Sequence, residues 1–109
     1  MSTILITGAS HGVGRAFAVA CAQSGRFTKI ILNSGSDKAA LEDTARRVSA
    51  AGDLVCAFDT GDVGDLAYVR GLRERFGPAN LYILLHQYHY IYTNTIILYL
   101  APIRPNKFL

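Results

Sequence analysis

The stretch TGASHGVG at residues 7–14 places three glycines within eight positions, directly after a short apolar run. Residues 3–7 (TILIT) are β-branched or apolar and predict a buried strand that ends at Gly8. From Gly12 onward a helical period is predicted, and Gly25 is typical of a helix C-cap. The apolar seam expected for this helix is Val13, Ala16, Phe17, Ala20 and Cys21.

The same alternation of strand and helix continues along the chain. Further strands are predicted at residues 28–33, 54–58 and 81–85. The helix between the first two is capped by Ser36 or Asp37 and ends at Gly52, with the seam Leu41, Ala45 and Val48. The next helix opens at Asp62 or Asp65 and stops at Gly77–Pro78, with the seam Leu66, Val69, Leu72 and Phe76.

Short apolar strands that alternate with amphipathic helices indicate an α/β fold. We predict a Rossmann-like, doubly wound parallel sheet with the strand order 3-2-1-4 and α-helices on both faces. Four strands make up only the first half of such a sheet, so the fold is expected to be truncated. In this fold, ligands bind beyond the carboxyl ends of the strands, at the first strand-to-helix turn.

The glycines of this turn suit a phosphate ligand. Gly8 permits a tight turn, and Gly12 and Gly14 have no Cβ that would keep a phosphate away from the helix N-terminus. An ordinary glycine-rich turn is the alternative. The position between a strand and a helix favours nucleotide binding.

With the threonine before it, TGASHGVGRA closely resembles the cofactor loop of the short-chain dehydrogenase/reductase family, and the resemblance covers residues 1 to about 85. It implies an NAD(P)-dependent carbonyl reductase or alcohol dehydrogenase that transfers a hydride to or from a small carbonyl or alcohol substrate. It also implies that the pyrophosphate is held by Gly8, Ser10, Gly12, Val13 and Gly14.

The family distinguishes its cofactors at the end of the second strand, where an acidic residue favours NAD. This chain has Asn33–Ser34 there and no acid before Asp37, so the resemblance favours NADP, with Asn33 and Ser34 beside the ribose phosphate. His11 stands where many NADP-preferring relatives carry Arg or Lys; a solvated loop residue is the alternative.

The segment FDTGD at residues 58–62 resembles the family's D-[VL]-x-[DN] segment. The resemblance assigns the adenine contact to Asp59, with Thr60 beside it. The alternative is that Asp59 ends a strand and Asp62 caps a helix.

The likeness fails after the fourth strand. His86–His89 stand where the family has N-N-A-G, and no tyrosine of the chain has a lysine four positions later. The family's acid is the tyrosine of Tyr-x-x-x-Lys, so no residue here can be assigned a catalytic role. A non-catalytic nucleotide-binding module, or an inert truncated fragment, is therefore the alternative function.

The composition changes near residue 80: all ten glycines and all eight acidic residues precede it, and five of the six tyrosines follow it. We therefore expect a nucleotide-binding unit at residues 1–85 and an atypical tail at 86–109, which a changed reading frame or exon would explain. A membrane span is the less favoured reading, because the tail's β-branched and aromatic residues suit strands, as does the alternation of Tyr88, Tyr90 and Tyr92. An apolar fourth strand at the sheet edge predicts self-association or a homo-oligomer; the alternative is that the tail covers this edge.

The remaining composition is uninformative about partners. The net charge of +3 comes from scattered basic residues, so we expect no nucleic-acid partner. Cys21 and Cys56 have no metal-ligand spacing and are read as buried free thiols, with no metal site. Without an N-terminal signal pattern, a cytoplasmic location is expected.

Overall fold

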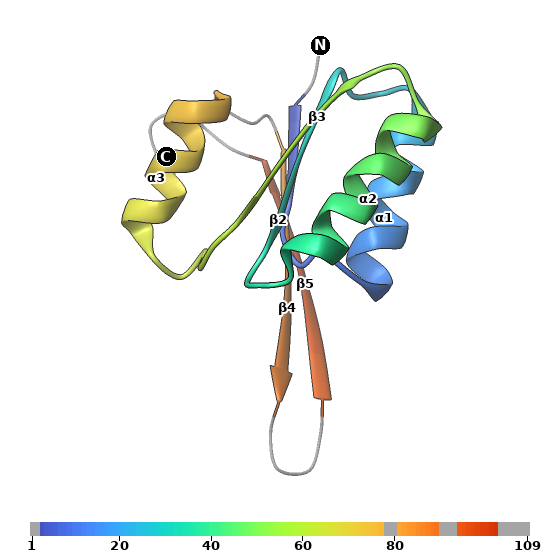
Figure 1. The fold of residues 1–109 in the computed structure, drawn as a ribbon. Helices are drawn as coiled ribbons and strands as arrows, with labels where there is room; N and C mark the ends of the chain where they lie inside the picture. Colours follow the sequence, from blue (N-terminus) through green and yellow to red (C-terminus); the bar gives the residue numbers. More distant parts are fainter. Residues whose placement is uncertain (1–2, 78–80, 90–93, 103–109) are drawn as a thin grey trace.

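The computed structural model describes residues 3–77, 81–89 and 94–102. Its elements are β1 (Thr3–Ile6), α1 (Gly12–Ser24), β2 (Lys29–Ser34), α2 (Lys38–Ala51), β3 (Val55–Thr60), α3 (Leu66–Phe76), β4 (Leu81–His89) and β5 (Asn94–Pro102) (Figure 1). The elements up to β4 were predicted, with small shifts at their ends. The strand β3 runs on to Thr60, so Asp59 and Thr60 are its last residues rather than loop residues.

The strands form one sheet in the order β3-β2-β1-β4-β5. The pairs β1–β2, β2–β3 and β1–β4 are parallel, whereas β5 runs antiparallel to β4. The register aligns Asn33 with Asp59 and Ser34 with Thr60. The glycine turn, which follows β1, and the last residues of β2 and β3 thus lie together where the parallel strands end.

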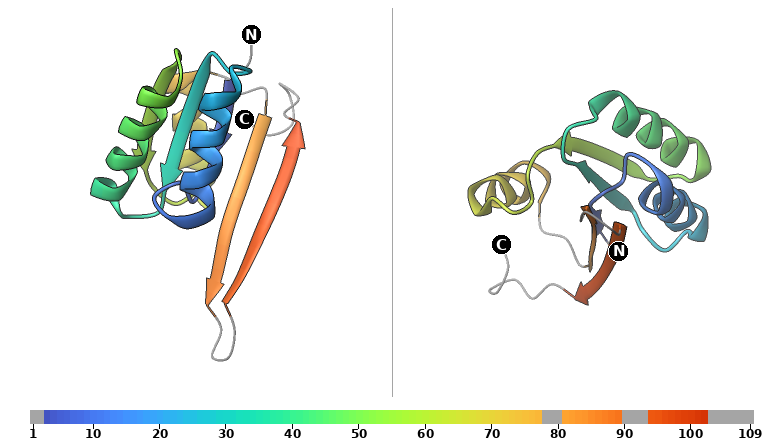
Figure 2. Two further views of the ribbon diagram at one scale, coloured as in Figure 1. Left: turned by 90° about the vertical axis from the view of Figure 1, so that its right-hand side faces the viewer. Right: turned by 90° about the horizontal axis from the view of Figure 1, so that it is seen from below.

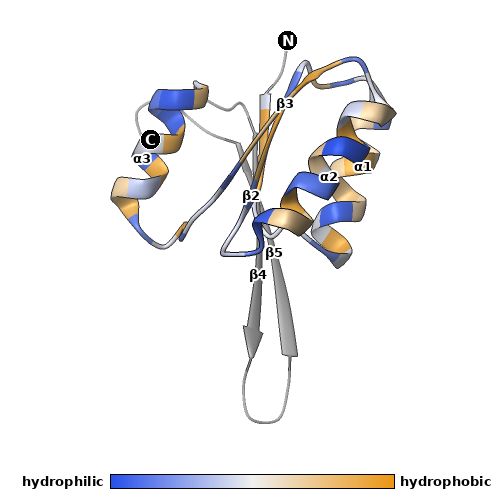
Figure 3. Ribbon diagram, in the orientation of Figure 1, coloured by the Kyte–Doolittle hydropathy of each residue, from blue (hydrophilic) through white to orange (hydrophobic). Residues whose placement is uncertain are grey.

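Helices cover both faces of the sheet, as the Rossmann-like fold requires (Figures 1 and 2). The helices α1 and α2 lie on one face and α3 on the other. Hydrophobic residues concentrate along β1 to β3 (Figure 3). The main core lies between the sheet and the helix pair, and consists of Ile4, Ile6, Ala9, Ala18, Cys21, Ala22, Ile30, Leu32, Leu41, Ala45 and Val48.

Because side chains alternate across a strand, Leu5 and Ile31 point to the opposite face, the one that α3 covers. Both are 3% exposed, as is Leu72 of α3. The predicted seam of α3 is only partly correct, since Leu66 at its start is 55% exposed.

The seam predicted for α1 is only partly correct: Cys21 lies in the core and Phe17 packs against it, but Val13, Ala16 and Ala20 are exposed. The buried residues of this helix are Gly14, Ala18, Cys21 and Ala22, whereas Val13 is 54% exposed. Alanines occupy residues 16, 18, 20 and 22, so hydropathy alone does not fix which side faces the sheet. In the fold, Gly14 packs against Gly8 and thereby sets the rotation of the helix.

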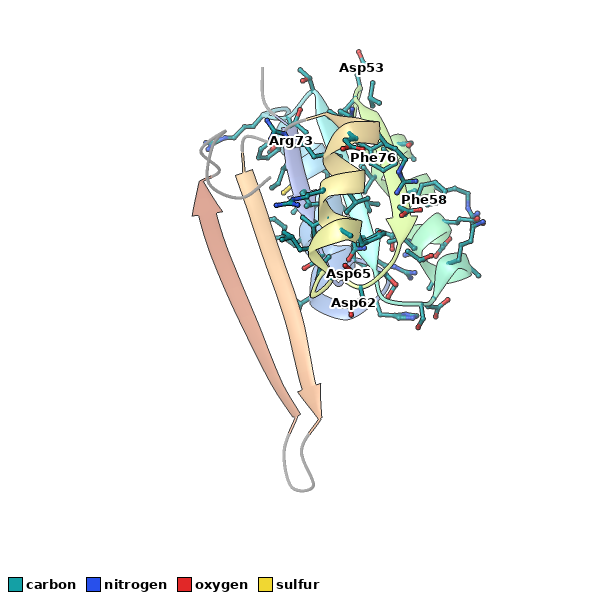
Figure 4. The ribbon with its side chains drawn as sticks, turned by 90° about the vertical axis from the view of Figure 1, so that its left-hand side faces the viewer. Asp53, Phe58, Asp62, Asp65, Arg73 and Phe76 are labelled. Atoms are coloured by element: carbon teal, nitrogen blue, oxygen red, sulfur yellow. The ribbon has the colours of Figure 1, made fainter. Side chains whose placement is uncertain are left out.

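Side-chain hydrogen bonds at the helix N-termini show which of the predicted capping residues cap α2 and α3. Asp37 caps α2 by accepting a hydrogen bond from the Ala40 amide, and Asp65 caps α3 through the Ala67 amide. Of the two candidates for α3, Asp62 lies in the preceding turn (Figure 4). At the other end of α3, the Lys29 ammonium donates to the carbonyl oxygen of Phe76, which fastens the helix to β2.

The strand β4 pairs with β1 only through Leu81–Ile83, whereas it pairs with β5 along its whole length, Leu81–His89. This hairpin extends past the ends of the other strands, on the side of the glycine turn (Figures 1 and 2). The strand β5, from the expected tail, pairs with β4 and covers the edge that β4 would otherwise leave. The strand β4 continues to His89, beyond the predicted residues 81–85. Tyr90 and Tyr92 of the expected strand face lie outside the described residues.

Candidate functional site

The glycine turn connects β1 to the N-terminus of α1, and two of its glycines give the turn its backbone shape. Gly8 and Gly12 have φ of 63° and 55°, in the left-handed region that glycine adopts without strain. The N-cap residue His11 makes no side-chain cap hydrogen bond, and the first turn of α1 contains no acidic residue. The amides at this end and the positive end of the helix dipole therefore remain available to an anion.

The third glycine has a different role from the one expected of it. A Cβ at Gly14 would overlap with the carbonyl group of Gly8, whereas a Cβ at Gly12 would meet nothing within 4 Å. The absent side chain of Gly14 thus makes room for the chain's own backbone. The turn is further fixed by the amide of Ala9, which donates to the carbonyl of Asn33 at 2.9 Å.

The predicted residues at the end of β2 are both buried, with Asn33 1% and Ser34 3% exposed. The Asn33 side chain points to the face that α3 covers. Its amide nitrogen donates to the Tyr68 hydroxyl at 3.0 Å and to the carbonyls of Asp59 and Gly61 at 3.3 Å each. This amide therefore ties the end of β2 to the end of β3 and to α3.

On the face of the sheet that α1 and α2 cover, a side-chain contact joins the N-termini of these two helices. His11 Nε2 lies 2.9 Å from a carboxylate oxygen of Asp37, and both side chains are exposed. Hydrogen bonds from the Ala40 amide and from His11 lower the pKa of Asp37. Arg15 of α1 donates to Thr44 Oγ1 at 2.9 Å and to the Ala40 carbonyl at 3.0 Å, and so fixes α2 against α1.

The carboxylate of Asp59 is held by two donors from α3. The Tyr68 hydroxyl lies 2.9 Å and Arg75 Nη2 lies 2.7 Å from the same oxygen, Oδ2. The hydrogen bond from Arg75, and after it that from Tyr68, lowers the pKa of Asp59. Burial and the Asp59 carboxylate raise the pKa of Tyr68 to about 12, so its hydroxyl stays protonated and can donate.

The fold thus brings the predicted residues to one edge in two groups. One group is the glycine turn with Ser10 and His11, and the other is the ends of β2 and β3 with Asn33, Ser34, Asp59 and Thr60. Sequence reasoning missed Tyr68, Arg75 and Arg15. Tyr68 and Arg75 reach Asp59 from α3, whereas Arg15 contacts α2 from the first turn of α1. In the sequence, only Gly61 marks the place where one of them, Tyr68, packs.

The described part of the chain contains neither a metal-binding cluster nor a membrane-spanning helix. No group of three or more His, Cys, Asp or Glu side chains within it could hold a metal ion. No helix among the described residues combines the length and the hydropathy needed to cross a membrane.

No protein-family model and no curated protein matches the sequence. Solved structures do match it. Levodione reductase superposes with a TM-score of 0.60 at 34% identity, over 72% of this chain and 31% of that one. The bulky-bulky ketone specific alcohol dehydrogenase from Comamonas testosteroni gives 0.57 at 30% identity, over 71% and 31%. A short-chain dehydrogenase from Sphingobium yanoikuyae in complex with NADPH gives 0.57 at 28% identity, over 69% and 28%.

The Rossmann-like fold, its glycine turn and these similarities define the class of protein. The chain corresponds to the N-terminal region of the short-chain dehydrogenases/reductases, and the proteins that it resembles are oxidoreductases. It spans about 30% of the length of these three structures.

Proposed function

We propose that this chain binds a nicotinamide dinucleotide at the turn between β1 and α1, as the cofactor-binding part of an oxidoreductase. The observation that carries the proposal is the local geometry of the turn. Gly8 and Gly12 are left-handed, Gly14 packs on Gly8, and the N-terminus of α1 has no side-chain cap. A pyrophosphate would accept hydrogen bonds from the amides of Gly12, Val13 and Gly14, with Ser10 beside it.

We propose NADP rather than NAD as the cofactor. The end of β2 carries Asn33 and Ser34, so no carboxylate there would repel a 2′-phosphate. The first acid after β2, Asp37, is hydrogen-bonded to His11 and caps α2. The complex of the Sphingobium yanoikuyae enzyme with NADPH is consistent with this choice. Asp59, with Thr60 beside it, would receive the adenine.

The reaction we propose for the oxidoreductase is hydride transfer between the nicotinamide and a small carbonyl or alcohol. The 109 residues contain no Tyr-x-x-x-Lys, so none of them is assigned the proton transfer to the substrate oxygen. We therefore expect this chain by itself to act as a nucleotide-binding module. Its two free cysteines suit a reducing cytoplasm.

Titration of the purified chain with NADPH and with NADH, followed by the nicotinamide fluorescence, tests the proposal. We expect saturable binding of both, with NADPH the tighter ligand. A folded chain that gives no saturable signal with either would contradict it. A parallel assay of NADPH oxidation with a panel of ketones and aldehydes should show no turnover, and turnover would exclude the non-catalytic module.

A further inference from the structure

A hydrogen-bonded chain of three side chains links the buried sheet to the candidate adenine site. The Asn33 amide donates to the Tyr68 hydroxyl at 3.0 Å, and this hydroxyl in turn donates to Asp59 Oδ2 at 2.9 Å. Asn33 is 1% exposed, whereas the Asp59 side chain is 28% exposed. These hydrogen bonds therefore connect the buried amide of Asn33 to the Asp59 carboxylate, which solvent can reach.

The backbone is shaped to receive the Tyr68 ring. A Cβ at Gly61 would overlap with this ring, so only glycine leaves room for the ring to pack on the segment that follows β3. Gly61 is itself held in place, because its amide donates to the Ser34 carbonyl at 2.9 Å and its carbonyl accepts from Asn33. Tyr68 is thus fixed both at its ring and at its hydroxyl.

The second donor to Asp59 comes from a more exposed position. Arg75 reaches the same Oδ2 from the far end of α3, and its side chain is 51% exposed. Ion pairs at such exposure contribute little fixed geometry, because the long side chain retains other rotamers. Both side-chain donors bind Oδ2, so the other oxygen, Oδ1, receives no hydrogen bond from a side chain of the described residues. The carboxylate also accepts a hydrogen bond from the backbone amide of Thr60.

We propose that Tyr68 is a positioning residue for nucleotide recognition: it holds Asp59 by Oδ2 and so presents Oδ1 to the 6-amino group of adenine. This inference rests on the proposed function, in which Asp59 contacts the adenine. It adds that the buried amide of Asn33 fixes the Tyr68 hydroxyl, that this hydroxyl orients the Asp59 carboxylate, and that Arg75 is dispensable for the orientation. Hypoxanthine, which has a carbonyl in place of the amino group, is the base that this arrangement rejects.

The alternative is that the Tyr68 hydroxyl only fastens α3 to the sheet. The two roles differ in what they do to selectivity between bases. Loss of a purely structural contact weakens binding of adenine and hypoxanthine dinucleotides by the same factor. Loss of a positioning contact reduces the ratio of the two affinities.

The test compares the dissociation constants of NADPH and of its hypoxanthine analogue for the whole chain and for three variants. The wild-type chain is expected to favour the adenine form by at least about fivefold, as one hydrogen bond to a charged group predicts. Tyr68→Phe should bring the ratio close to one, and Arg75→Gln should leave it at the wild-type value. Circular dichroism establishes that each variant is folded.

The third variant, Asp59→Asn, is independent of whether Tyr68→Phe folds. The Tyr68 hydroxyl donates a hydrogen bond, so it should bind the side-chain oxygen of the new Asn. The NH₂ group of this Asn would then occupy the place of Oδ1. The preference should then reverse in favour of hypoxanthine, whose carbonyl accepts. An Asp59→Asn chain that keeps the wild-type preference would overturn the inference.

The remaining outcomes separate the inference from the function on which it rests. Tyr68→Phe with the wild-type ratio, or a wild-type chain that binds both dinucleotides equally, would overturn the role of Tyr68 and leave nucleotide binding intact. A folded wild-type chain that binds neither dinucleotide would overturn the proposed function, and the inference with it.

Discussion

The carbonyl group of Gly8 occupies the space that a side chain at Gly14 would need. The first turn of α1 therefore packs directly on the turn that leaves β1. The helix N-terminus thus lies beside the carboxyl end of β1, which pairs with β2 on one side and β4 on the other. This contact between two backbones is what connects the glycine pattern to both the fold and the candidate site.

Gly14→Ala should disrupt this contact. The added methyl group meets backbone that cannot move without displacing the turn, so we expect a loss of about 1–3 kcal/mol in the free energy of unfolding. The affinity for NADPH should fall by about tenfold or more, because the amides of the turn are displaced. Urea unfolding and NADPH titration measure the two effects.

Gly71→Ala is the matched control for this substitution. Gly71 lies within α3, and a Cβ there would meet nothing within 4 Å. Alanine in a helix is more stable than glycine by about 0.5–1 kcal/mol, so this variant should be slightly stabilised and should bind NADPH normally. Equal losses in the two variants would contradict the role given to Gly14.

The charge at the end of β2 should decide between the two cofactors. In Ser34→Asp, the new carboxylate would repel a 2′-phosphate, and we expect the ratio of NADPH to NADH affinity to fall by about tenfold or more. Ser34→Asn adds similar bulk without charge and should leave the ratio largely unchanged. If both variants change the ratio equally, the preference depends on size rather than charge.

The pair of His11 and Asp37 offers a second test of the same preference. Asparagine caps helices as well as aspartate does, so Asp37→Asn should keep the cap of α2 and change the stability by less than about 0.5 kcal/mol. It removes a negative charge from the proposed phosphate site, so NADPH should bind more tightly while NADH is unaffected. A weaker affinity for NADPH in this variant would contradict the placement of the 2′-phosphate near His11.

The lowered pKa of Asp59 predicts how stability depends on pH. A carboxyl with a lower pKa in the folded than in the unfolded chain stabilises the fold fully above its unfolded pKa, about 3.9. This contribution is lost as the pH falls through the folded pKa. The difference in unfolding free energy between the wild type and Asp59→Asn should therefore shrink below about pH 4. Asp53→Asn, at an exposed carboxylate, provides the control.

Burial raises the pKa of both thiols, Cys21 and Cys56, to about 11. At pH 8 their thiolate fraction is then roughly a hundredfold below that of a thiol with a pKa of 9. Alkylation by iodoacetamide at pH 8 should be slow in the folded chain and fast in denaturant. Rapid modification of the folded chain would show that these strands and helices open readily.

The parts of the fold that local sequence signals determine were predicted correctly. Gly25 ends α1, Asp37 caps α2, and the seam of α2 is buried as expected, because each depends on a few neighbouring residues. The rotation of α1 was not predictable in this way, since alanines lie on both its buried and its exposed side and the contact with Gly8 decides it.

In the candidate site, too, the part formed by neighbouring residues was predictable and the part formed by distant residues was not. Its glycine turn follows from residues 7–14 alone. The surroundings of Asp59 depend on Tyr68 and Arg75, which a helix brings to it from nine and sixteen positions away, and on Asn33 in a neighbouring strand. Neither hydropathy periodicity nor a local motif in the sequence indicates contacts between residues at these separations.

The central claim is that the turn between β1 and α1 holds the pyrophosphate of a dinucleotide. The most direct measurement is the change in backbone amide resonances of the ¹⁵N-labelled chain when NADPH is added. We predict the largest shifts at Gly12, Val13 and Gly14, with further shifts at Thr60 and Gly61. Saturable shifts confined to other parts of the chain, or no shifts in a folded sample, would contradict the claim.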